Sequence, residues 1–174
     1  SVNVNWEFQT MSIQTRRLLG TSLLLTSLMF GASQALAEVV LHRGNSGEPQ
    51  TLDQANTSID IEAFILKDLY EGLTIYDAKG EIVPGAAESW TISDDGTVYT
   101  FKIRENAKWS DGSPVTAEDF VYSIQRVQNP ETAAKYANIL YPIKNAEKAN
   151  KGEAKLEDIG AKAVDAKTLE ITLE

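Results

Sequence analysis

The chain has 174 residues, no cysteine and one histidine, and its formal net charge is −9 at pH 7. The absence of cysteine excludes disulfide bonds, and a single histidine leaves almost no material for His/Cys metal sites or for Cys-His and Ser-His catalysis. The acidic balance argues against nucleic-acid binding and against adhesion to anionic membranes, which both rest on basic patches.

The first part of the chain is not typical of a folded domain. Residues 1–10 precede the first methionine and have no periodic pattern, so we interpret them as an upstream, non-native segment. Residues 11–37 follow the order of a secretory signal: a short basic segment, an apolar run from 18 to 30 and a small-x-small cleavage site at Ala35 and Ala37. The sequence therefore predicts a signal peptide over 11–37.

Two alternative interpretations of this segment have less support. A membrane-spanning helix needs roughly 20 apolar residues, whereas this run is shorter and is interrupted by glycine, serine and threonine. The pair Arg16-Arg17 raises the twin-arginine export route, but its flanks fit that motif only in part. No cysteine follows the apolar run, so we expect a soluble, exported protein without a lipid anchor, starting at Glu38.

After the signal, short strands and helices alternate. Residues 38–43 form an apolar strand candidate. A helix is predicted from about 59 to 70, because apolar residues recur there every three or four positions. Gly72 is expected to end this helix by taking a left-handed backbone conformation. A strand over 73–76 and a turn over 77–80 follow.

The stretch from Ala87 to Phe120 is the most densely specified part of the chain. Strands are predicted over 89–92 and 97–104, and the Asp-Gly between them supplies the positive backbone angles of a hairpin turn. Trp90 and Trp109 lie beside these strands and turns, so core packing is favoured over stacking on a sugar.

A helix completes this stretch. After a second turn over 110–114, Thr116 is the predicted N-cap of a helix over 117–127. Acidic residues in its first turn suit the positive end of the helix dipole. Its apolar face is expected to consist of Phe120, Ile124 and Val127.

The last part of the chain is mostly polar. Residues 144–155 are expected to form a solvated helix followed by a loop, and residues 169–174 alternate like a strand. Because the chain ends within that pattern, we expect a truncated reading frame. Acids are numerous, but nothing besides their abundance supports a glycosidase-type carboxylate pair or an oxygen-only cation site.

Several segments together closely resemble the periplasmic oligopeptide- and dipeptide-binding proteins, the family 5 receptors of peptide ABC importers. They are D-L-Y-E-G-L at 68–73, P-G-A-A-E-S-W at 84–90, the stretch 87–120, Tyr136-Ala137 and T-L-E-I-T-L at 168–173. The resemblance extends over nearly all of residues 38–174. Members of this family are longer than this chain, which agrees with the expected truncation.

The resemblance implies a mixed α/β (α+β) fold, a periplasmic-binding-protein type II-like two-lobed receptor. Of this receptor the chain would contain only the start of lobe I and most of the family's extra domain. Residues 38–71 would be the first piece of the ligand-binding lobe I. Residues 72–174 would belong to the extra domain, which lies away from the cleft.

The resemblance also implies two candidate ligand contacts. A tyrosine in the segment after the first helix of the extra domain reaches the amino-terminal end of the peptide, and here that tyrosine is Tyr136. The alternative is a packed surface tyrosine. Some oligopeptide receptors have an acidic residue at the position of Ser58, and Asp60 and Glu62 are near but in the wrong register. The acidic contact of the family is therefore not matched here. Ser58 is kept as the second candidate by its position alone, and the length and charge preference of the ligand stay open.

The implied function is that of a monomeric, non-enzymatic receptor without cofactor or metal. It would bind extended peptide backbone, close around it by a hinge and deliver it to permease subunits in the inner membrane. Two alternatives stay open. The same scaffold could take another ligand, such as a murein peptide, a nickel complex, haem or an oligosaccharide, or the protein could be a periplasmic chaperone-like interaction module.

Overall fold

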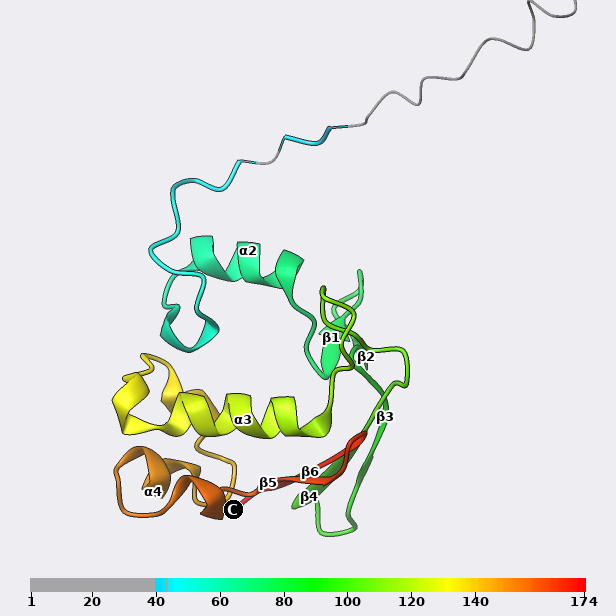
Figure 1. Ribbon diagram of the computed structural model, residues 1–174, viewed down its shortest axis with the longest axis vertical. Helices are drawn as coiled ribbons and strands as arrows, with labels where there is room; N and C mark the ends of the chain where they lie inside the picture. Colours follow the sequence, from blue (N-terminus) through cyan, green and yellow to red (C-terminus); the bar gives the residue numbers. More distant parts are fainter. Residues whose placement is uncertain (1–39, 43) are drawn as a thin grey trace, which may run out of the picture. The chain divides into compact units, whose positions relative to one another are not determined.

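The computed structural model describes residues 40–42 and 44–174 (Figure 1). The predicted upstream segment and the signal peptide, with its cleavage residues Ala35 and Ala37, lie outside the described residues. Residues 40–42 form no strand, so the strand predicted over 38–43 is wrong at these positions. A strand needs a neighbour that pairs with its backbone groups, and no strand in the described part of the chain pairs with these residues.

The elements before the main sheet are a 3-10 turn, a helix and a hairpin. They are η1 (Gln54–Asn56), α2 (Asp60–Leu69), β1 (Thr74–Tyr76) and β2 (Ile82–Pro84). Strands β1 and β2 pair antiparallel around a turn at 77–80, as predicted for β1 and the turn. Strand β2 was not predicted, because its three residues end in a proline and show no alternation long enough to recognise.

Helix α2 ends earlier than predicted and for a different reason. Tyr70 is already extended, with φ −126° and ψ 155°, and Gly72 does not take the expected left-handed conformation. Gly72 and Gly85 instead allow two backbone segments to approach closely. A Cβ on Gly85 would lie 2.5 Å from the carbonyl oxygen of Gly72, and that oxygen accepts a hydrogen bond from the Ala86 amide.

The main sheet has four antiparallel strands in the order β3-β4-β6-β5. Their bounds are β3 (Ala87–Ile92), β4 (Val98–Ile103), β5 (Ala161–Asp165) and β6 (Thr168–Thr172). The predicted hairpin is confirmed, with β3 beginning two residues earlier than expected. Its turn contains Gly96 at φ 74°, and Asp95 accepts hydrogen bonds from Ser93 and Thr97 there.

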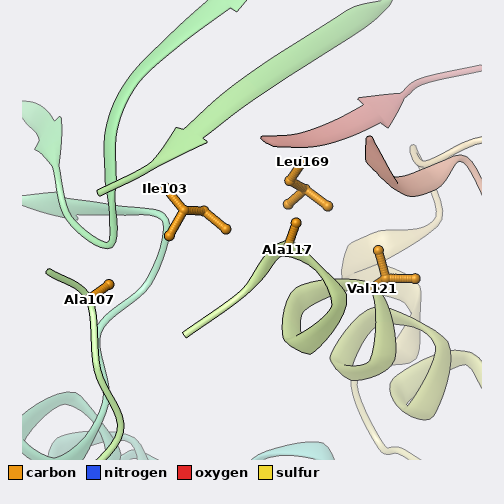
Figure 2. Packing of buried hydrophobic residues seen from close by; sticks show 5 residues of the cluster. All are labelled: Ile103, Ala107, Ala117, Val121 and Leu169. Carbon is orange, nitrogen blue, oxygen red and sulfur yellow. The ribbon is translucent and has the colours of Figure 1, made fainter. Parts of the chain in front are cut away.

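Helix α3 (Ala117–Gln128) packs on one face of this sheet and lies between the sheet and α2 (Figure 1). Thr116 is its N-cap, as predicted, and Asp119 accepts the Thr116 amide hydrogen bond at 2.8 Å. Strand residues Ile103 and Leu169 meet α3 in the first core cluster (Figure 2). The members of that cluster are Ile103, Ala107, Ala117, Val121 and Leu169.

The buried face of α3 is rotated relative to the prediction. Its buried residues are Ala117, Val121 and Gln128, while Phe120 and Ile124 are partly buried at the two core clusters. Val127, which was expected on the same face, lines a surface groove beside Arg126 instead. The spacing of the large apolar residues predicted the helix correctly. It did not predict that small and polar residues of α3 would be the most deeply buried ones.

Helix α4 (Ala146–Asn150) confirms the helix expected within 144–155, but the helix is not solvated all round. Ala146 and Ala149 are 0% and 1% exposed and pack with Ile143, Ile159 and Ala161 in a second core cluster. Two alanines in a lysine-rich segment carry too little hydrophobic signal to predict this burial.

The two tryptophans near the hairpin have different environments. Trp90 is half-buried and packs against Phe101, with ring centroids 6.4 Å apart. Trp109 is 42% exposed, so the prediction of core packing is wrong for it. Its indole nitrogen donates a hydrogen bond to Asp119 at 3.3 Å, which holds the ring over the start of α3.

Candidate ligand-binding site

The structure brings the two sequence-predicted site residues together. The Tyr136 hydroxyl donates a hydrogen bond to the Ser58 carbonyl oxygen at 3.4 Å, although the two residues are 78 positions apart. The adjacent Lys135 ammonium donates to the Ser58 hydroxyl at 3.1 Å. Tyr136 is 52% exposed, so much of its ring is open to another molecule. We call Ser58, Lys135 and Tyr136 the Ser58 junction.

Ser58 is positioned by a buried carboxylate at the start of α2. Glu62 is 1% exposed, and its Oε2 accepts hydrogen bonds from the amides of Ser58 at 2.8 Å and Ile59 at 3.4 Å. Its Oε1 accepts from the Gln50 amide. These bonds, the Ser58 amide first, lower the pKa of Glu62. Glu62 therefore closes the amino-terminal end of the helix and is not available to a ligand.

Tyr136 is positioned from the carboxyl-terminal end of α3. Gln128 is fully buried, and its Nε2 donates to the Ala137 carbonyl oxygen at 2.9 Å. Its Oε1 has no hydrogen-bond partner in the described part of the chain. The loop that precedes Tyr136 is fixed by the Asn129 side chain, which accepts the Glu131 amide bond, and by Ala133 at φ 51°. Sequence reasoning missed Gln128, because a polar residue at a helix end is ordinarily exposed.

An ion pair joins the segment before α2 to α3. Both carboxylate oxygens of Asp53 accept hydrogen bonds from the Arg126 guanidinium at 2.6 Å. Arg126 is the main reason why the pKa of Asp53 falls to about 2. Asp53 also caps η1 by accepting bonds from the Ala55 amide and the Asn56 side chain. This pair fixes the position of the segment that leads to Ser58.

A second ion pair fixes the other end of α2. The Arg104 guanidinium contacts the carboxylate of Glu71 and also donates to the Gly85 carbonyl oxygen at 2.8 Å. Since α2 lies between Asp53 and Glu71 in the chain, ion pairs attach the segments on both sides of it to Arg126 in α3 and to Arg104 after β4.

Two surface grooves run beside these ion pairs. One, of about 390 Å³, lies between η1 and α3, and the other, of about 570 Å³, extends along the Gly72 and Arg104 backbone. The residues that line both grooves are Gln54, Tyr70, Trp109, Asp119 and Ser123. Neither of these two grooves includes a residue of the Ser58 junction, in which Lys135 and Tyr136 are exposed and Ser58 is half-buried.

The side chains at this site are groups that can form hydrogen bonds with a ligand. The Ser58 junction offers a phenol, a hydroxyl and an ammonium group, which can donate or accept hydrogen bonds. Within residues 40–42 and 44–174, no group of three or more His, Cys, Asp and Glu side chains could hold a metal ion. In the same residues, no helix combines the length and apolar character needed to cross a membrane.

Comparison with known proteins gives a consistent result. The family model of the bacterial extracellular solute-binding proteins, family 5 (middle region), matches residues 81–174, more than half of the chain. The periplasmic oligopeptide-binding protein OppA of Escherichia coli is 42% identical over 171 residues, which are 91% of this chain and 31% of that protein. The periplasmic murein peptide-binding protein MppA of E. coli is 46% identical over 129 residues, 73% of this chain and 24% of the relative.

The chain is also similar in structure to a solved protein with the same name as the first of these relatives. Haemophilus influenzae OppA in complex with the peptide RPPGFSPFR is similar with a TM-score of 0.72 and 40% identity over 74% of this chain and 26% of that structure. The chain thus spans between about a quarter and a third of the proteins that it matches. The mixed α/β fold expected from the sequence is confirmed, with structural neighbours among the type II-like peptide receptors. The chain belongs to the bacterial extracellular solute-binding proteins, family 5.

Proposed function

We propose that this chain is part of an extracytoplasmic receptor that binds extended peptides and delivers them to an ABC importer. The observation that supports it most is the Ser58 junction, in which two positions expected to contact a peptide meet across 78 residues of sequence. A peptide is bound in the similar Haemophilus influenzae protein. The relatives OppA and MppA of E. coli are solute-binding proteins, and we accordingly propose a receptor that is not an enzyme.

In this proposal Tyr136 contacts the amino-terminal end of the peptide. Its hydroxyl would exchange or share its bond to the Ser58 carbonyl, and its half-exposed ring would cover the first side chain. The peptide backbone would be bound by main-chain hydrogen bonds. Hinge closure around the ligand would then let the permease distinguish a loaded receptor from an empty one.

The proposed division of the chain places residues 38–71 in lobe I and residues 72–174 in the extra domain. The exposed apolar side of α2 supports it, since Phe64 and Leu69 are 48% and 61% exposed. A helix with such a face ordinarily packs against further structure, which lobe I of a longer receptor would supply. Residues 44–71 and 72–174 lie in one compact unit here, and the contacts of Asp53 and Glu71 with arginines join them.

The proposed location is the periplasm. It rests on the signal expected over residues 11–37, with cleavage after Ala37, and on the periplasmic names of the relatives. A soluble monomer without a lipid anchor is proposed, since no cysteine follows the apolar run. Mass spectrometry of the exported protein would test the cleavage site, because the mature chain should begin at Glu38.

A receptor chimera tests the function. In it, residues 44–174 replace the matching part of E. coli OppA, and binding of tri-alanine is measured by isothermal titration calorimetry. We expect micromolar or tighter binding by the chimera, a loss of about tenfold with Tyr136→Ala, and no measurable binding by the 174-residue chain alone. A folded chimera that binds no peptide would contradict the proposal. Binding by the chain alone would show that the cleft lies elsewhere.

A further inference from the structure

Three cationic side chains reach from the region of α3 and the sheet to the segment around α2. Arg104 contacts the carboxylate of Glu71, and Arg126 contacts the carboxylate of Asp53. Lys135 differs from both, since its partner is the neutral hydroxyl of Ser58. Two of the three cations thus form ion pairs, and the third forms none within residues 40–42 and 44–174.

Lys135 forms no ion pair with a carboxylate in the described part of the chain. No acidic oxygen lies within ion-pair distance of its ammonium group. Glu62, the buried acid nearest to Ser58, is occupied by the amides of Gln50, Ser58 and Ile59. Asp60 at the start of α2 is exposed and makes no ion pair with Lys135.

The ammonium group is also held in place. A lysine on an open surface ordinarily samples many rotamers, whereas Lys135 is bonded to Ser58 at 3.1 Å and is adjacent to Tyr136, whose hydroxyl bonds to the same residue. An ammonium has three donors, and one of them is used here. A cation with further donors beside an exposed aromatic ring is suited to an anionic group.

We propose that Lys135 determines the charge preference of the site, favouring a ligand with a carboxylate side chain near the end that Tyr136 covers. This inference rests on the proposed peptide-receptor function. The ligand carboxylate would form with Lys135 the ion pair that Asp53 and Glu71 form with the two arginines. A cationic ligand side chain at the same place is disfavoured by like-charge repulsion.

The test compares pairs of tripeptides that differ only in charge, with the receptor chimera and calorimetry. Ala-Glu-Ala against Ala-Gln-Ala probes the second position, Asp-Ala-Ala against Asn-Ala-Ala the first, and Ala-Ala-Glu against Ala-Ala-Gln the third. We expect the acidic peptide to bind about fivefold more tightly at the first or second position, as an ion pair of about 1 kcal/mol provides. No preference is expected at the third position.

Three variants identify the residue responsible. Lys135→Gln should bring the ratio of the two affinities to about one, and Lys135→Arg should retain it. Ser58→Asp should also remove the preference, because it supplies the counter-charge within the receptor. Lys79→Gln, in the exposed turn between β1 and β2, is the matched control and should leave the ratio unchanged.

The outcomes separate the inference from the proposed function. Equal binding of acidic and neutral peptides, or a preference that survives Lys135→Gln, overturns the role of Lys135 while leaving the receptor function intact. A folded chimera that binds none of the peptides overturns the receptor function itself. If the large exchange does not fold, a smaller chimera that exchanges only residues 52–62 and 129–140 answers the same question.

Discussion

The ion pair between Asp53 and Arg126 stabilises the contact between the segment before α2 and α3, and its contribution is measurable in the isolated chain. Arg126 first, and then the Ala55 amide and the Asn56 side chain, lower the pKa of Asp53 from 3.8 to about 2. The whole shift corresponds to about 2.5 kcal/mol, which is an upper limit for the ion pair. Because the Asp53 and Arg126 side chains are 34% and 37% exposed, solvent screening reduces this to about 1 kcal/mol. Urea unfolding of Asp53→Asn, Arg126→Gln and the double variant at neutral pH should give a coupling free energy of that size.

The ion pair between Asp53 and Arg126 also makes the free energy of unfolding depend on pH. The pKa of Asp53 is lower in the folded than in the unfolded chain, so its contribution is complete above about pH 4 and is lost as the pH falls towards 2. About half of it should remain at about pH 3. The exposed pair Glu147 and Lys151 in α4 is the matched control and should give a smaller coupling. A coupling for Asp53 no larger than the control, or one that does not decrease in acid, would refute this reasoning.

Two further substitutions test the packing of the domain by urea unfolding. Leu169→Ala removes a fully buried side chain from the first core cluster and should cost about 3 kcal/mol, whereas Val164→Ala at a 54% exposed position should cost less than about 0.5 kcal/mol. Gly85→Ala should cost about 1–3 kcal/mol, because its Cβ would lie 2.5 Å from the Gly72 carbonyl oxygen. Gly44→Ala meets no atom within 4 Å and serves as its control. Similar losses at Leu169 and Val164, or a neutral Gly85→Ala, would contradict the packing described above.

The β3–β4 hairpin and the start of α3 could be predicted because residues next to each other in the sequence specify them. An Asp-Gly between two alternating runs predicted the β3–β4 hairpin, and Thr116 with acidic residues after it predicted the start of α3. The end of α2 was placed within one residue, but the role of Gly72 was wrong, because Gly72 was interpreted as a helix terminator. Its structural reason is the contact with the backbone around Gly85, and a single sequence gives no sign of that distant contact.

The candidate site could be predicted only in part. The resemblance to a family identified Tyr136 and Ser58, but it gave no indication that they contact each other. The segments that carry them are held by Glu62, by Gln128 and by the ion pair of Asp53 with Arg126, whose two members are 73 positions apart. Glu62 and Gln128 are buried polar residues, and hydrophobic periodicity cannot identify such positions. The role of Tyr136 in ligand binding stays a prediction.

The central claim is that residues 44–174 form part of a peptide receptor. Native mass spectrometry of the receptor chimera, purified from the E. coli periplasm without added ligand, tests it most directly. The account predicts a protein with bound masses of short peptides and a lower occupancy for the Tyr136→Ala variant. A folded chimera that is always empty, or one that retains unfolded protein clients in place of short peptides, would contradict it.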